Sequence, residues 1–136
     1  MRPAIWVHID GGARPNPGKG SIGVVIRGGT WDYTISKSIP GNDVSNNRAE
    51  YEALLCALIE LIKNRLTSHD ITVYSDSEML VEQMNGRKSI DTGGSYVRPC
   101  LKCKELLGLF TNLSLIHIDR EDNDEANMLV IKGRLN

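Results

Sequence analysis

The stretch "AIWVHIDGGARPNPGKGSIGVVIRGGTWDYTISKSI", residues 4–39, decides the fold. Apolar side chains occupy every second position from Ile5 to Ile9, which is the period of a β-strand, and a run rich in glycine and proline then breaks the pattern. A second alternating run begins at Ser21 and closes on Gly28-Gly29, a pair that predicts a tight hairpin. We therefore expect three antiparallel strands at the start of the chain.

Beyond this stretch the apolar period changes from two residues to that of a helix. Leucine and isoleucine recur at helical spacing from about Arg48 to Lys63, in a segment of good helix formers. Shorter elements follow, namely a strand at 69–77, a helix at 77–86 closed by Gly86, a helix at 98–110 with Pro99 in its first turn, a strand at 112–118 and a helix at 123–133. Early hairpins followed by crossover units predict an α/β fold, with helices packed on a mixed sheet.

Composition restricts the class of protein. The 136 residues suit one domain with a real core, no apolar run approaches the length of a membrane span, and the N-terminal sequence lacks the long apolar stretch of a secretory signal. Three cysteines make no disulfide framework, and Cys100 and Cys103 lack the partner ligands of a zinc site. We expect reduced thiols, a cytoplasmic protein and no membrane partner. A net charge of −1 argues against binding nucleic acid through a broad positive surface.

Glu50 is the most informative single residue. It shares the apolar stripe of its predicted helix with Leu54 and Leu58, so its carboxylate is expected to face the sheet. A capping box is the simple explanation, with Asn47 as the N-cap and Glu50 reaching back to its amide. An acid placed there for chemistry is the alternative.

Two aspartates follow predicted strands. Asp10 ends the first strand and precedes two glycines, whereas Asp76 lies between Ser75 and Ser77 where a helix begins. Local turn and cap chemistry would explain each one separately, for instance Ser75 as an N-cap with Glu78 as its partner. The carboxyl ends of strands in an α/β sheet and the adjoining helix starts converge on one edge, so three carboxylates are expected to meet there. They would repel one another without a cation, and hard oxygen ligands favour Mg²⁺.

Four motifs together resemble type 1 ribonuclease H. They are "HIDGGARPNPGKGSIGVVI", "SNNRAEYEALLCAL", "VYSDSEMLVEQMNG" and "HIDREDNDEANMLV", and in this order they span nearly the whole chain. The resemblance implies a ribonuclease H-like fold with a five-stranded mixed sheet flanked by helices, in a single catalytic domain over residues 1–136. It also implies an endonuclease that cuts the RNA strand of an RNA/DNA hybrid.

The resemblance assigns the family's acids to positions in this chain. The first three fall on Asp10, Glu50 and Asp76, and the fourth falls on Asn127, where the usual "AD" of the motif reads "AN". The implied mechanism uses two Mg²⁺ ions, with Mn²⁺ as a substitute, roughly 4 Å apart around one phosphate. Asp10 would bridge both ions, with Glu50 and Asp76 on the leaving-group side and residue 127 on the water side. The expected products carry a 5′ phosphate and a 3′ hydroxyl.

Further roles carry over from the family to two groups of residues. Recognition of the minor groove and the 2′-hydroxyl would fall on Gly12, Ala13, Asn16, Asn46 and Asn47. A helper in product release would be Glu121, Asp122 or His117. Turn and cap chemistry explains the asparagines equally well, and packing explains a histidine in a strand. The loop at 86–99 is short and carries few cations, so affinity for the hybrid is expected to be modest and sensitive to salt.

Asn127 leaves the reading of the site open. A neutral amide can ligate a metal but removes one negative charge, so activity is expected to be reduced. Four explanations fit the amide. It is natural and tolerated, it is natural in a weakened or inactive homologue, or it was introduced to slow hydrolysis. The fourth is that Asn127 is simply a residue of the first turn of a helix.

The alternative function is a catalytically silent nucleic-acid-binding module. The three acids argue against it, because a binding module has no reason to keep three carboxylates that repel one another. Excision from a larger reverse transcriptase or transposase is disfavoured, because the sequence begins and ends close around the expected fold. We expect a monomer without an obligate protein partner.

Overall fold

Five strands form one mixed sheet in the computed structural model, which describes residues 3–135. The strands are β1 (Ile5–Arg14), β2 (Gly18–Gly28), β3 (Trp31–Val44), β4 (Asp70–Ser75) and β5 (Asn112–His117). Their order in the sheet is β3-β2-β1-β4-β5, with the first three antiparallel and β4 and β5 parallel to β1. The predicted fold class, a five-stranded mixed sheet flanked by helices, is confirmed.

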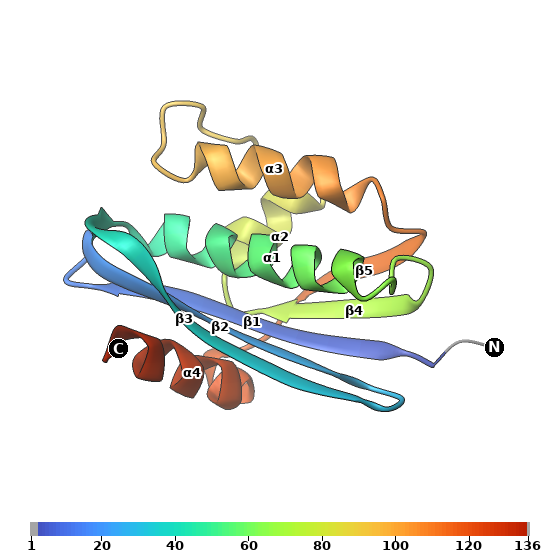
Figure 1. Cartoon of the computed structure of the whole chain (residues 1–136). Helices are drawn as coiled ribbons and strands as arrows, with labels where there is room; N and C mark the ends of the chain where they lie inside the picture. Colours follow the sequence, from blue (N-terminus) through green and yellow to red (C-terminus); the bar gives the residue numbers. More distant parts are fainter. Residues whose placement is uncertain (1–2, 136) are drawn as a thin grey trace.

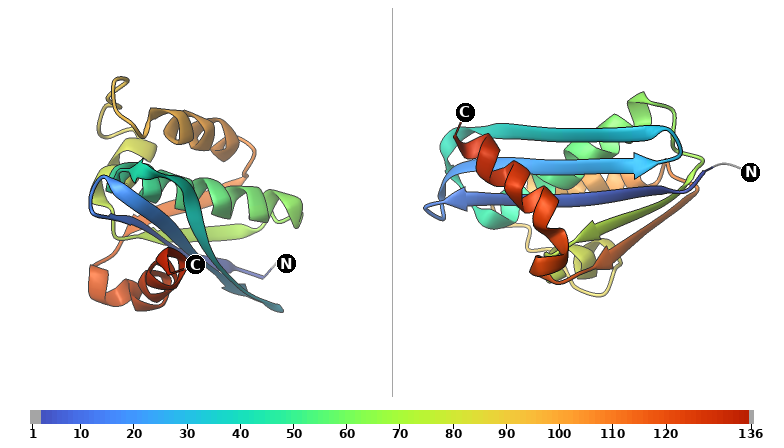
Figure 2. Two further views of the ribbon diagram at one scale, coloured as in Figure 1. Left: turned by 60° about the vertical axis from the view of Figure 1, so that its left-hand side comes forward. Right: turned by 90° about the horizontal axis from the view of Figure 1, so that it is seen from below.

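Helices cover both faces of this sheet (Figure 1). On one face lie α1 (Asn46–Lys63), α2 (Glu78–Met84) and α3 (Val97–Leu107), and on the other lies α4 (Asp124–Arg134), preceded by a short 3₁₀ turn at Arg120–Asn123. Figure 2 shows α4 crossing beneath the long antiparallel strands. The main core lies between the sheet and α1, where strand residues such as Val7, Val24 and Val73 and helix residues such as Leu54 and Leu58 are fully buried.

The first strand is longer than the alternating pattern predicts. The sequence reading ended it at Asp10, whereas the structure continues it through the two glycines to Arg14. Pairing explains the difference, because Gly11 and Gly12 lie opposite Ile22 and Ser21 of β2, which supplies their backbone partners. Asp10 therefore lies within a strand rather than at the start of a turn. The predicted hairpin is present, with Gly28 opposite Trp31 and Gly29 at a φ of 58°.

Two predicted helix caps are wrong. The N-cap of α1 is Ser45, whose hydroxyl accepts from the Arg48 amide at 3.1 Å, rather than Asn47. The N-cap of α2 is Ser77, which accepts from the Leu80 amide at 3.2 Å, rather than Ser75. The capping box that would have explained Glu50 is therefore absent, and its carboxylate has a different partner.

Close backbone contact and polar anchors attach α4 to the sheet. A Cβ on Gly23 would lie 2.2 Å from the carbonyl oxygen of Ala126, so only glycine lets the helix come this near to β2. The Ser21 hydroxyl donates to the carbonyl of Val130, and the Ser36 hydroxyl donates to that of Leu129.

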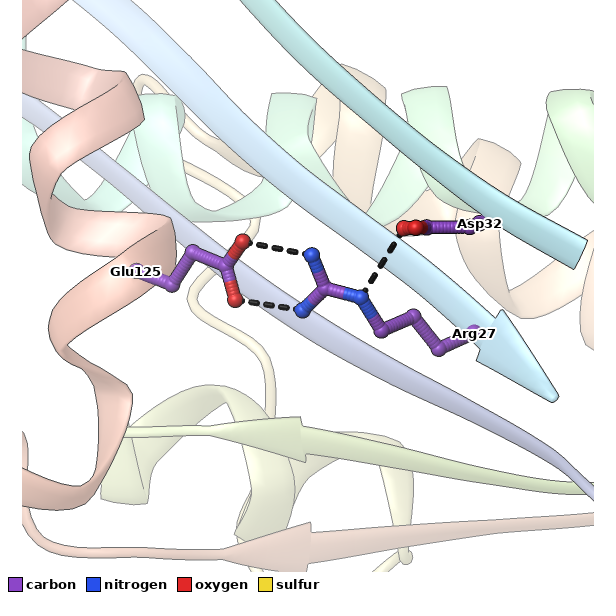
Figure 3. A network of polar contacts seen from close by, with 3 residues as sticks. All are labelled: Arg27, Asp32 and Glu125. Carbon is purple, nitrogen blue, oxygen red and sulfur yellow. Dashed lines mark hydrogen bonds and ion pairs between the residues drawn. The ribbon is translucent and has the colours of Figure 1, made fainter.

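At the start of α4 an ion-pair network joins the helix to two strands. Arg27 of β2 binds both carboxylate oxygens of Glu125 and reaches Asp32 of β3 at 3.0 Å (Figure 3). Within residues 3–135, no helix is long and apolar enough to cross a membrane.

Candidate active site

Asp10 and Glu50 meet because β1 and α1 come into direct backbone contact. The amide of Gly11 donates to Glu50 Oε1 at 2.7 Å and to Asp10 Oδ1 at 2.9 Å. A Cβ on Gly11 would lie 2.2 Å from the carbonyl oxygen of Ala49, so a side chain there would push the two elements apart. Glycine at position 11 thus brings the first two carboxylates together.

Asp76 completes a cluster of three acids. It follows the end of β4, the parallel neighbour of β1, and one carboxylate oxygen from each of Asp10, Glu50 and Asp76 lies within 4.8 Å of the others. Asp10 and Glu50 are each only 8% exposed, and Asp76 is half-buried. The sequence-based expectation that the three carboxylates meet at one edge of the sheet agrees with this arrangement.

Burial makes negative charge costly in this cluster. Burial, together with the charge of Asp76, raises the pKa of Asp10 to about 6, although a hydrogen bond with Glu50 opposes the shift. Burial, followed by the charge of Asp10, raises the pKa of Glu50 well above its ordinary value. Because the donors are hard carboxylate oxygens, a divalent cation such as Mg²⁺ fits this site and would restore the ionised forms.

The acids lie in a cleft of about 410 Å³. Of the other residues predicted from the sequence, Asn127 of α4 lines this cleft, as do Gly12, Ala13 and Asn46. Asn127 therefore faces the same space as the three carboxylates. The amide belongs to the site by position as well as by motif.

Asn16 is connected to the cleft through hydrogen bonds. Its side-chain oxygen accepts from the backbone amide of Asn46 at 2.9 Å, and the side-chain oxygen of Asn46 accepts from the amide of Ala13 at 2.9 Å. Asn47 is exposed in the first turn of α1 and does not line the cleft.

The three predicted helper residues lie outside the cleft. Glu121 and Asp122 line a separate hollow beside Trp6 and His8. His117 is exposed at the end of β5, opposite Ser75 in the strand register. The structure does not bring any of them among the residues that line the acid cleft.

Sequence reasoning missed several residues at the site. Arg14, Arg120 and Arg134 line the cleft together with Ser77, Val130 and Ile131. Helical spacing was a usable signal for α4, because residues 127, 130, 131 and 134 share one helix face. Asn123 was missed too, although it is 1% exposed and its side-chain amide donates to the carbonyl of Ile9 at 2.9 Å. This bond supports the backbone directly before Asp10.

Comparison with known proteins gives consistent matches. A family model described as "Reverse transcriptase-like" matches residues 8–133. The ribonuclease HI of Halobacterium salinarum is 29% identical over 126 residues, which cover 92% of this chain and 61% of that relative. A bifunctional protein of Mycobacterium tuberculosis is 34% identical over 129 residues, covering 92% of this chain and 34% of its own length. The chain thus spans between a third and three fifths of these curated relatives.

Solved structures share the fold over almost the full length of this chain. The N-terminal RNase H domain of the mycobacterial protein superimposes with a TM-score of 0.85 at 26% identity, over 96% of this chain and 98% of that one. An RNase H1 isolated from compost, solved in complex with an RNA/DNA hybrid, has a TM-score of 0.83 at 35% identity, over 94% of each chain.

Proposed function

Since this chain belongs to the reverse transcriptase-like family and is a ribonuclease H1-like protein, we propose that it is an endoribonuclease that hydrolyses the RNA strand of RNA/DNA hybrids. The observation that carries the proposal is the buried cluster of Asp10, Glu50 and Asp76 within a cleft. The hybrid bound to the compost enzyme supports the choice of substrate. We take residues 1–136 as one catalytic domain.

Two Mg²⁺ ions, with Mn²⁺ as a substitute, would be held by Asp10, Glu50, Asp76 and Asn127. When bound, such ions activate water and stabilise the leaving oxygen of a phosphodiester. The protein's own contribution is to orient the acids, and the Gly11 amide does this by donating to both Asp10 and Glu50. The products are a 5′ phosphate and a 3′ hydroxyl.

Asn127 sets the expected level of activity. Its amide offers one neutral oxygen where a carboxylate would add a full charge, so the site holds its cations less strongly and reacts more slowly. The proposed contact surface for the hybrid consists of Gly12, Ala13, Asn16, Asn46 and Asn47. Hydrogen bonds link Asn16 to Asn46 and Asn46 to Ala13, which supports a surface that is formed before the hybrid binds. We also propose that one of Glu121, Asp122 and His117 helps in product release, and these roles are proposals. So are the monomeric state, the absence of an obligate protein partner and the cytoplasmic location.

The test is cleavage of a hybrid labelled at the end of its RNA strand, in Mg²⁺ and in Mn²⁺. The chain itself is compared with Asn127→Asp, with Asp76→Asn as the inactive control and a hybrid labelled on the DNA strand as the strand control. We expect cleavage of RNA alone, and acceleration of roughly tenfold or more by Asn127→Asp. Hybrid binding without cleavage by either protein would reject the nuclease and favour the silent binding module.

A further inference from the structure

Three arginines line a cleft whose centre is acidic. They are Arg14 at the end of β1, Arg120 at the start of the 3₁₀ turn and Arg134 in the last turn of α4. Among residues 3–135, none of the three forms an ion pair with a carboxylate. By contrast, Arg27, Arg48 and Arg87 are each paired with a glutamate. The cleft therefore contains guanidinium groups that the protein's own acids leave available.

The guanidinium of Arg134 lies beside Gly12, near the end of β1, where the absence of a side chain leaves space. Its Nη1 is 3.5 Å from the position that a Cβ on Gly12 would occupy, with Val130 at 3.7 Å and the Asn46 side-chain oxygen at 3.9 Å. Arg134 is half-buried, so its guanidinium is oriented by its surroundings rather than extended freely into solvent. A planar guanidinium held in this way suits a phosphate, which it can bind through two parallel hydrogen bonds.

The spacing along α4 fits a second phosphate of the strand that is cut. Asn127 and Arg134 lie on one face of the helix, two turns apart, which is about 10 Å. One strand of a duplex advances about 3.4 Å per nucleotide along its axis. A group about 10 Å along α4 from Asn127 therefore reaches a phosphate within roughly three nucleotides of the one that the acid cluster would hold.

We propose that Arg134, with Arg14 lining the same cleft, binds a backbone phosphate of the RNA strand within about three nucleotides of the scissile position. The inference rests on the proposed function and deepens it by assigning a binding subsite. It also accounts for affinity in a protein with a net charge of −1, because the cations are concentrated where the substrate backbone passes.

Two measurements test the proposal. In steady-state cleavage by the chain, Arg134→Gln is expected to raise KM by about threefold to tenfold and to leave kcat within about twofold, since it removes binding made equally before and during reaction. In hybrid binding, measured in an Asp76→Asn background over a salt series, Arg134→Gln is expected to lower the slope of log K against log salt by about one, and the double change with Arg14→Gln by about two.

Matched variants separate charge from structure. Arg134→Lys keeps the charge and is expected to keep the salt slope. Arg65→Gln removes a cation from the loop between α1 and β4, which lies at the opposite end of the sheet from the C-terminal end of α4 (Figure 1), and should leave KM and the slope unchanged. A lower melting temperature for Arg134→Gln with an unchanged salt slope would overturn the proposal and leave only a helix-end role. A chain that neither binds nor cuts the hybrid would overturn the proposed function as well, so the two failures are distinguishable.

Discussion

Asp10 occupies a position where ionisation works against folding. Because burial raises its pKa to about 6 from 3.8, the folded protein holds this proton more tightly than the unfolded chain does. Without metal, the free energy of unfolding is therefore expected to fall as the pH rises from about 4 to about 6, and the penalty is complete above that range.

Replacing Asp10 by an amide should stabilise the metal-free protein while abolishing cleavage. At pH 7.5 we expect Asp10→Asn to raise the free energy of unfolding by about 1 to 3 kcal/mol, because a buried charge and its repulsion with Glu50 and Asp76 disappear. Urea unfolding in a chelator measures this. At pH 3.5, where the carboxyl is neutral in the folded protein and mostly protonated in the unfolded chain, most of the gain should disappear, and a gain independent of pH would contradict the explanation.

Gly11 and Gly12 provide a matched pair at the centre of the site. A Cβ at position 11 would meet the Ala49 carbonyl oxygen at 2.2 Å, whereas one at position 12 meets nothing closer than 3.5 Å. We expect Gly11→Ala to lower stability by about 2 to 3 kcal/mol and Gly12→Ala by well under 1 kcal/mol, measured by urea unfolding. Equal losses would show that contact with α1 is not what requires glycine at position 11.

The three acids were predictable from the sequence, but their partners were not. Glu50 stood out because a carboxylate on an apolar stripe needs a reason, and Asp10 and Asp76 because each follows a strand. The capping box failed because Ser45 caps the helix two residues earlier than expected. The bond from the Gly11 amide to Glu50 joins residues far apart in the chain, and no local pattern encodes it.

At the scale of single elements, α4 combines little burial of its own side chains with several polar contacts to the sheet. Only Ala126, Val130 and Gly133 of this helix are buried, while its start is tied down through Glu125 (Figure 3). The Arg27–Glu125 pair is partly exposed, so a double-mutant cycle with Arg27→Met and Glu125→Gln should give a coupling of under about 1 kcal/mol. That coupling should shrink further in 1 M salt. A large coupling insensitive to salt would show that the pair does more than anchor a helix end.

Elements with a clear periodic pattern of apolar residues were predicted closely, whereas strand ends that depend on pairing with a neighbouring strand were not. The helix expected from about Arg48 to Lys63 is α1, Asn46–Lys63, because its apolar spacing is clear over many turns. β1 extends beyond its predicted end because β2 pairs with the glycine positions that a local pattern assigns to a loop. The cleft arginines were missed because the three lie in three different elements, and only the fold brings them to one cleft.

For the whole molecule, binding of Mg²⁺ should raise the free energy of unfolding and the melting temperature. A cation that binds only the folded state adds about 1.4 kcal/mol at ten times its Kd, or a rise in melting temperature of about 5 °C for a chain of this size. Because protons compete for Asp10 and Glu50, the rise should be larger at pH 7.5 than at pH 5. Differential scanning fluorimetry checks this, with Asp10→Asn as the control that should lose most of the rise.

The order of the elements along the chain has a consequence for protein synthesis. Three acids come from β1, α1 and the end of β4, but the wall that carries Asn127 and Arg134 belongs to α4, which leaves the ribosome after all of these elements. Until then the face of β2 around Gly23 lacks its cover, and the cleft has only part of its lining. A nascent chain halted before residue 120 should therefore hold most of its sheet yet bind a hybrid poorly, so the proposed binding of a hybrid is expected to begin only when α4 has been synthesised.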